Sequence, residues 1–166
     1  MDYSKIKFLF LDVDGTLTDG KIYMSDSGEL FKAFDVKDGC GIKDILPKLD
    51  IKPVIITARS SKILLNRCKE LSIDMIFQNT RDKVGKIKEI MDKYGYSLNS
   101  EGVYEEAAYM GDDILDIPPM MLCKVRACPD NAVNKVKECC NFISTKNGGD
   151  GAVRELIEDM LGYDFG

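Results

Sequence analysis

The stretch Ile6-Lys7-Phe8-Leu9-Phe10-Leu11-Asp12-Val13-Asp14-Gly15 decides the fold of this chain, because it joins an apolar run to a pair of acids. The run is typical of a strand that is buried in a sheet. Asp12 and Asp14 leave that strand at its carboxyl end, where open α/β sheets place their ligand crevices. One such carboxylate can act as a nucleophile while the other carries a proton, and both can bind a hard cation. A strand that merely ends in an acidic turn would look the same, so the interpretation depends on the rest of the chain.

Three later segments also place polar groups after an apolar run. They are Ile51–Ile56 followed by Thr57, Met75–Phe77 followed by Lys83, and Ala107–Met110 followed by Gly111-Asp112-Asp113-Ile114-Leu115-Asp116. Taken singly, Thr57 is an ordinary strand-ending residue, Lys83 a solvated lysine at a helix start, and Asp112-Asp113 a helix cap. The carboxyl ends of parallel strands meet at one edge of a sheet, so we expect these groups to converge on Asp12 and Asp14.

Strand and helix patterns alternate along the chain, which is typical of a doubly wound α/β fold. We predict one Rossmann-like domain over residues 1–166, with a mainly parallel sheet and helices on both faces. Helices are expected at 38–46, 60–71, 82–94, 131–138 and 151–161, the last strands at 124–127 and 141–143, and a polar loop at 95–106. Pro47 is expected to end the first helix. A β-hairpin is predicted at about 20–35, and the intervals between motifs leave no room for a cap domain.

The composition restricts the class of function. The net charge of -5 offers no basic surface for nucleic acid or for an anionic membrane. No apolar segment approaches the roughly 18 residues of a membrane-spanning helix, and the first residues do not form a secretory leader. The chain has no histidine, which excludes histidine-based catalysis, and its six cysteines form no C-x-x-C pair. Reduced thiols in a cytoplasmic protein are therefore favoured over a zinc site or disulfides.

In this order, the four motifs resemble the haloacid dehalogenase superfamily of phosphotransferases. Three longer segments resemble one subfamily, the 3-deoxy-D-manno-octulosonate 8-phosphate phosphatases: Asp12 to Gly20, Lys37 to Ile42, and Gly148 to Glu155. The resemblance extends from Lys5 to about Leu161. It implies a phosphomonoester hydrolase whose substrate is a sugar-acid phosphate.

The resemblance also implies the catalytic roles. Asp12 would attack phosphorus and form an aspartyl-phosphate intermediate. Asp14 would protonate the leaving sugar oxygen and then deprotonate the attacking water. Thr57 would donate a hydrogen bond to the phosphoryl group, and Lys83 would neutralise charge on the phosphate and on Asp12.

A magnesium ion completes the expected site, because an anionic nucleophile and an anionic ester would otherwise repel each other. By resemblance, the ligands of Mg²⁺ would be the carboxylates of Asp12 and Asp112 and the backbone carbonyl of Asp14. Asp113 and Asp116 would support the ion's water ligands, Lys83 or the adjoining loop.

The substrate implied first is 3-deoxy-D-manno-octulosonate 8-phosphate, and a nonulosonate 9-phosphate is the alternative. Arg59, in Thr57-Ala58-Arg59, could pair with the sugar carboxylate, although relatives more often have glycine at position 58. Further substrate contacts are expected from Lys37, Asp38 and Arg154. Arg154 could equally be a residue of the helix surface.

The hairpin carries more apolar surface than an isolated two-stranded excursion should expose. Together with the resemblance, it predicts a homotetramer in which neighbouring subunits complete the open site. Two other functions remain possible at this point. One is a receiver-like phospho-switch, and the other is a non-catalytic partner of a sugar-acid cytidylyltransferase.

Overall fold

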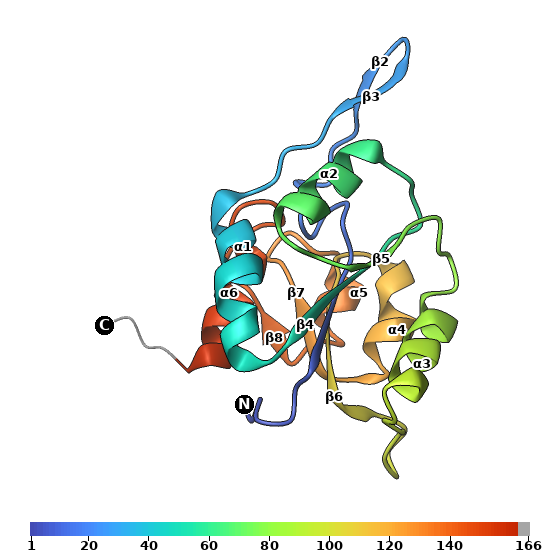
Figure 1. Cartoon of the computed structure of the whole chain (residues 1–166), viewed down its shortest axis with the longest axis vertical. Helices are drawn as coiled ribbons and strands as arrows, with labels where there is room; N and C mark the ends of the chain where they lie inside the picture. Colours follow the sequence, from blue (N-terminus) through green and yellow to red (C-terminus); the bar gives the residue numbers. More distant parts are fainter. Residues whose placement is uncertain (163–166) are drawn as a thin grey trace.

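Strand β1 (Phe8–Leu11) lies inside a six-stranded sheet in the computed structural model, which describes residues 1–162 (Figure 1). The other strands are β4 (Lys52–Ile56), β5 (Met75–Phe77), β6 (Tyr104–Met110), β7 (Cys123–Cys128) and β8 (Phe142–Ile143). Their order is β5-β4-β1-β6-β7-β8, and all neighbours pair in parallel. The predicted fold class is confirmed. The predicted domain over 1–166 extends past the described part of the chain at residues 163–166.

Helical segments cover both faces of this sheet. One face carries α1 (Val36–Cys40), η1 (Gly41–Ile45), η2 (Leu46–Leu49), α2 (Lys62–Glu70) and α6 (Ala152–Leu161), and the other carries α3 (Lys83–Lys93), α4 (Ile117–Met120) and α5 (Asn134–Lys137). In β1, Leu9 and Leu11 pack toward the first group, while Phe8 and Phe10 pack toward the second. Of the helices within residues 1–162, none is long and apolar enough to cross a membrane.

The direction in which the chain adds strands reverses at β1. The first crossovers place β4 and then β5 on one side, and the later ones place β6, β7 and β8 on the other. Leu11 of β1 pairs with Met110 of β6, so the loops that begin at Asp12 and Gly111 start side by side. A reversal of this kind opens a ligand crevice at the carboxyl ends of the strands.

A β-hairpin, β2 (Tyr23–Ser25) and β3 (Gly28–Phe31), projects away from the sheet and its helices (Figure 1). The rings of Tyr23 and Phe31 stack with their centroids 4.3 Å apart, while Met24 and Leu30 are exposed. Between β1 and β4 the described chain forms only this hairpin and the segment from α1 to η2. No cap domain is inserted there, as predicted.

Three local predictions differ from the structure. Pro47 does not end the first helix, because it lies early in the 3-10 segment η2, where a missing N–H is tolerated. The polar loop predicted at 95–106 is shorter, since β6 already begins at Tyr104. The short segments η3 (Ile114–Asp116) and α4 were not predicted, because Pro118 and Pro119 argue against a helix unless they occupy its first turn.

Candidate active site

The loop after β1 is a tight turn that carries both acids. The carbonyl oxygen of Val13 accepts hydrogen bonds from the backbone N–H groups of Thr16, Leu17 and Thr18, at 3.2, 2.9 and 3.1 Å. Gly15 has a φ of +103°, and a side chain there would overlap the carboxylate of Asp112. Glycine is thus required both by the backbone conformation and by the close approach of the late aspartate.

A loop from the other end of the chain supports this turn. A side chain at Gly148 would overlap the carbonyl oxygen of Gly15, and the N–H of Gly149 donates to the carbonyl of Thr16 at 3.1 Å. The glycines that precede α6 therefore allow the two loops to pack backbone against backbone. This contact gives a structural reason for the glycine-rich segment near position 150.

Lys83 brings the first acid and a late aspartate together. Its Nζ lies 2.6 Å from Oδ1 of Asp12 and 2.7 Å from Oδ1 of Asp116, and all three side chains are buried. Burial alone would lower the pKa of Lys83, but the charges and hydrogen bonds of the two carboxylates outweigh it and raise that pKa. The lysine is therefore held as a cation beside Asp12.

Asp116 is fully engaged as a hydrogen-bond acceptor. Besides Lys83, its Oδ1 accepts from the hydroxyl of Tyr109 at 2.6 Å, and its Oδ2 accepts from the backbone N–H groups of Asp112 and Asp113 at 3.0 and 3.2 Å. A carboxylate so occupied is poorly placed to bind a metal ion as well. These contacts orient Lys83 and the loop after β6.

The donor set at the centre of the site fits a hard cation. Carboxylate oxygens of Asp12, Asp112 and Asp116 lie within 4.8 Å of one another. Burial, reinforced by the charges of neighbouring aspartates, raises the pKa values of Asp12 and Asp112 to about 7. A divalent ion would stabilise both acids in their ionised forms, and oxygen ligands of this type are those that Mg²⁺ prefers. Since Asp116 is occupied, Asp12 and Asp112 are the carboxylates suited to hold it.

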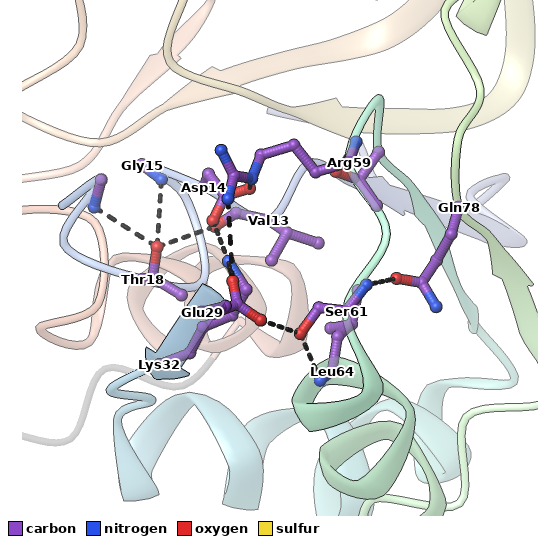
Figure 2. Close-up of polar contacts among 12 residues, drawn as sticks. Val13, Asp14, Gly15, Thr18, Glu29, Lys32, Arg59, Ser61, Leu64 and Gln78 are labelled. Carbon is purple, nitrogen blue, oxygen red and sulfur yellow. Dashed lines mark hydrogen bonds and ion pairs between the residues drawn. The ribbon is translucent and has the colours of Figure 1, made fainter. Parts of the chain in front are cut away.

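Asp14 lies in a different environment from Asp12. Its Oδ2 is 3.4 Å from Nε of Arg59, and its Oδ1 pairs with Nζ of Lys32, which comes from the hairpin (Figure 2). Thr57 is buried at the end of β4, and its Oγ1 accepts from the backbone N–H of Arg59 at 3.3 Å. The hydroxyl hydrogen of Thr57 is then available to a ligand. Arg59 was predicted to lie at this site, whereas Lys32 was not.

The other predicted substrate residues gather at the junction of α1 and α6. Asp38 is buried, and its Oδ1 accepts from the backbone N–H of Arg154 at 2.8 Å. Lys37 and Arg154 line a hollow of about 260 Å³, and Nε of Arg154 donates to Glu158 at 2.7 Å. Among the described residues, no hydrogen bond or ion pair joins these side chains to Asp12 or Lys83.

Asp113 is exposed and caps the short segment η3. Its carboxylate accepts from the backbone N–H of Ile114 at 2.7 Å, and the carboxylate of Asp116 reciprocates by accepting from the N–H of Asp113. This arrangement is a capping box, which fixes the start of a helical turn. Asp113 thus supports the loop that presents Asp112.

Three residues at the site escaped the sequence analysis: Glu29, Lys32 and Tyr109. Glu29 and Lys32 were read as residues of a hairpin with an exposed apolar surface, and Tyr109 as part of a buried strand. A polar side chain inside an otherwise apolar strand that precedes Gly111 was the signal for Tyr109, because a buried hydroxyl needs a partner. Nothing local in the sequence indicates that Lys32 reaches back to Asp14.

Comparisons with known proteins identify similar phosphatases. The chain is 36% identical over 156 residues to the 3-deoxy-D-manno-octulosonate 8-phosphate phosphatase KdsC of Escherichia coli, covering 94% of this chain and 79% of that protein. The solved structure of the same phosphatase from Moraxella catarrhalis, in complex with magnesium, phosphate and KDO, is 36% identical with a TM-score of 0.87. That comparison covers 96% of this chain and 88% of the other.

A hydrolase of the HAD superfamily from Legionella pneumophila gives a similar result. Its structure is 34% identical, with a TM-score of 0.87, and the match covers 96% of this chain and 84% of that one. No family model matches the chain.

Proposed function

The chain belongs to the family of 3-deoxy-D-manno-octulosonate 8-phosphate phosphatases within the haloacid dehalogenase superfamily, and from this membership we propose that it hydrolyses that sugar-acid phosphate. The observation that carries the proposal is the buried contact between Lys83 and Asp12, 2.6 Å long, beside the carboxylate of Asp112. It supplies a fixed nucleophile, a cation for phosphate and a place for a metal ion in one crevice. A receiver-like switch would not explain the similarity along nearly the whole chain.

The reaction starts with attack of a carboxylate oxygen of Asp12 on phosphorus. The bond from phosphorus to the sugar oxygen breaks, and Asp14 gives its proton to that oxygen, so that the sugar leaves as an alcohol and not as an alkoxide. A water molecule then attacks phosphorus and gives a proton to Asp14. The bond from phosphorus to the Asp12 oxygen breaks, which releases inorganic phosphate and restores the carboxylate of Asp12. Positioned proton transfer of this kind is worth about 10²–10⁴-fold in rate.

Two residues hold the phosphoryl group during these steps. Lys83 faces Asp12 from the start of α3 and balances the negative charge that the phosphate brings. Thr57, at the end of β4, can donate its hydroxyl hydrogen to a phosphoryl oxygen. Magnesium held by Asp12, Asp112 and the carbonyl of Asp14 would neutralise phosphate charge and reduce its repulsion from the nucleophile.

Arg59 is the residue best placed to recognise the sugar carboxylate. Its side chain is 45% exposed, and only one edge of the guanidinium faces Asp14 and Glu29. A planar guanidinium can therefore still offer N–H groups to an incoming carboxylate. Lys37 and Arg154 remain proposed contacts from the hollow beside α6, whereas the burial of Asp38 favours a structural role for that residue.

The proposed assembly is a homotetramer in the cytoplasm. Met24 and Leu30 on the projecting hairpin are 60% and 57% exposed, which supports a contact with other copies of the chain. The six cysteines, all within the described residues, form no disulfides, which is consistent with a reducing compartment. Light scattering coupled to size exclusion tests the assembly, and a species of 18.6 kDa alone would exclude it.

A phosphate-release screen tests the function. The substrates are 3-deoxy-D-manno-octulosonate 8-phosphate, nonulosonate 9-phosphates and neutral sugar phosphates, each with Mg²⁺ and with a chelator. We expect the octulosonate ester to give the highest kcat/KM and the chelator to abolish turnover. A nonulosonate ester as the best substrate would select the alternative. A best substrate without a carboxylate would refute the role of Arg59, and no turnover of any ester would indicate a non-catalytic partner.

A further inference from the structure

The base of the hairpin forms a buried charge network with Asp14. Lys32 follows directly after β3, and only 4% of its side chain is exposed. Its Nζ contacts Oδ1 of Asp14 and lies 3.0 Å from Oε1 of Glu29 (Figure 2). A buried ammonium group is stable only when it is well paired, so these two carboxylates determine where Lys32 lies.

Glu29 is the hub of this network. Its Oε1 also lies 3.8 Å from a terminal nitrogen of Arg59, and its Oε2 accepts a hydrogen bond from the hydroxyl of Ser61. Burial would raise the pKa of Glu29, but the hydrogen bonds from Ser61 and Lys32 and the charges of Lys32 and Arg59 outweigh it and lower that pKa. Two cationic side chains, Lys32 and Arg59, therefore each contact the carboxyl groups of both Asp14 and Glu29.

Ser61 connects the network to the body of the domain. Its Oγ accepts from the backbone N–H of Leu64 at 3.2 Å and so caps the start of α2, while its own N–H donates to Oε1 of Gln78. Figure 2 shows Ser61 and Glu29 between α2 and the loop that carries Asp14. The hairpin is thus attached to the active site by charged side chains as well as by its backbone.

We propose that Glu29 and Lys32 are positioning residues for Asp14, so that the hairpin sets the orientation of the acid–base carboxylate. Both oxygens of Asp14 face cations, and Glu29 fixes these cations by contacting each of them. Without Glu29, Lys32 and Arg59 would both have Asp14 as their remaining carboxylate partner in this network. The carboxyl group would then be drawn away from the direction in which it must pass a proton to the leaving oxygen.

The inference rests on the proposed function, and substrates with different leaving groups separate the two. A sugar alkoxide needs a proton as it departs, whereas p-nitrophenolate leaves without one. The parameter kcat/KM reports the phosphoryl transfer to Asp12, in which the leaving group departs. We expect Glu29→Gln to lower kcat/KM for the sugar-acid phosphate by about ten- to a hundredfold, part of the full acid–base contribution, and for p-nitrophenyl phosphate by less than about threefold.

Two reference variants make the outcome specific. Asp14→Asn should show the same dependence on leaving group with a larger loss, and failure to do so would refute the acid role of Asp14 itself. If Asp14→Asn shows the dependence and Glu29→Gln does not, the positioning role is overturned while the proposed function stands. Asp26→Asn removes a charge from the exposed tip of the same hairpin and should leave both substrates unaffected.

Lys32 provides a second test that leaves Glu29 intact. Lys32→Met should reproduce the selective loss, and Lys32→Arg, which keeps the charge, should recover most of the sugar-phosphate activity. Equal losses on both substrates in these variants would contradict the inference. Light scattering and circular dichroism on every variant check that fold and assembly match the wild type, and a selective loss that follows only a changed assembly would also overturn it.

Discussion

Asp116 and Asp38 are buried to the same depth, each 2% exposed, but they lie in regions of opposite character. Asp116, in the active-site pocket, receives hydrogen bonds from the ammonium of Lys83, the hydroxyl of Tyr109 and two backbone N–H groups. Asp38, at the junction of α1 and α6, receives backbone N–H donors at the start of α6 and pairs with no cation within residues 1–162. Burial, reinforced by the charge of Asp35, raises the pKa of Asp38 to about 6.

The two carboxyl groups differ in whether a cation balances their negative charge. In the pocket, the charge of Asp116 is matched by Lys83, which is aimed at the nucleophile. At the junction, Oδ1 of Asp38 accepts from the helix start while the buried Oδ2 has no hydrogen-bond partner among the described residues, and a neutral carboxyl group or an amide could accept the same bond. Here the buried acid that is paired with a buried cation is the one at the active site.

Removal of the pocket's cation should have the largest effect. Lys83→Met leaves Asp12 and Asp116 without their common partner and removes the charge that stabilises the phosphoryl group, so kcat should fall by about 10²–10³-fold or more. Lys86→Met is the matched control, because Lys86 pairs with the exposed Glu89 on the same helix. Steady-state kinetics with saturating Mg²⁺ measure kcat for both variants. Similar losses of kcat in both variants would show that Lys83 contributes no more to turnover than a surface lysine does.

Removal of the charge of Asp116 should have the next largest effect. In Asp116→Asn the amide oxygen can accept only part of the present hydrogen bonds, and Lys83 keeps a single carboxylate partner, so kcat should fall by about ten- to a hundredfold. Asp113→Asn, a change at the exposed cap three residues earlier, should cost less than about threefold. If the two variants lose equal activity, the loop after β6, and not the ion pair with Asp116, determines the position of Lys83.

Loss of the tyrosine hydroxyl should have a smaller effect. Tyr109→Phe removes one donor to Asp116 and one acceptor for Lys83, at 2.6 and 3.3 Å, without changing the shape of the buried ring. We expect a loss of several-fold in kcat and of about 1–2 kcal/mol in the free energy of unfolding. Urea denaturation and kinetics measure these quantities. Unchanged kcat would show that Asp116 orients Lys83 without the tyrosine.

Substitution of Asp38 at the junction should change the stability of the protein and not its activity. Asp38→Asn keeps an acceptor for the N–H of Arg154, so kcat should stay within about twofold of the wild type. The folded pKa of Asp38, about 6, is above the ordinary value of 3.8, so the folded state binds this proton more tightly than the unfolded state does. Wild-type stability from this group is fully present below pH 3.8 and is lost as the pH rises through about 6.

Urea denaturation of both proteins from pH 4 to pH 7.5 measures this loss. Between these limits the wild type should lose about 2–3 kcal/mol of unfolding free energy relative to Asp38→Asn. Titrations elsewhere in the chain cancel in the difference between the two proteins. If the difference in unfolding free energy between the two proteins does not change with pH, Asp38 ionises in the folded protein at no cost in stability. A large loss of activity in Asp38→Asn would instead support its predicted contact with the substrate.

The sequence was most informative where strands end. Apolar runs located β1, β4, β5 and β6, and the order of polar residues after them placed Asp12, Thr57, Lys83 and Asp112 at one edge of the sheet. This worked because the strands of a buried parallel sheet are recognisable as apolar runs, and because their carboxyl ends have to coincide. The predictions around Pro47 and the prolines of α4 were wrong, since proline is tolerated at the start of a helical segment but not within it.

The remaining features depend on contacts between distant residues. The contact of Lys32 with Asp14 depends on how the hairpin leaves the sheet, and Asp38 is distinguished from Asp116 only by what packs around each one. Local sequence does not predict these contacts, because an aspartate at a buried helix start and an aspartate in a buried ion pair differ only in their distant neighbours. The family resemblance located the site but gave no signal for Glu29, Lys32 or Tyr109.

The packing of Gly148 and Gly149 against the turn after β1 also affects the order of events during synthesis. The turn that carries Asp12 and Asp14 leaves the ribosome well before the backbone on which it rests, which is made more than a hundred residues later. A nascent chain stalled before position 148 could already pair most of its parallel strands but would hold both acids on an unsupported loop. Catalytic competence should therefore arise only after Gly148 and Gly149 have been translated.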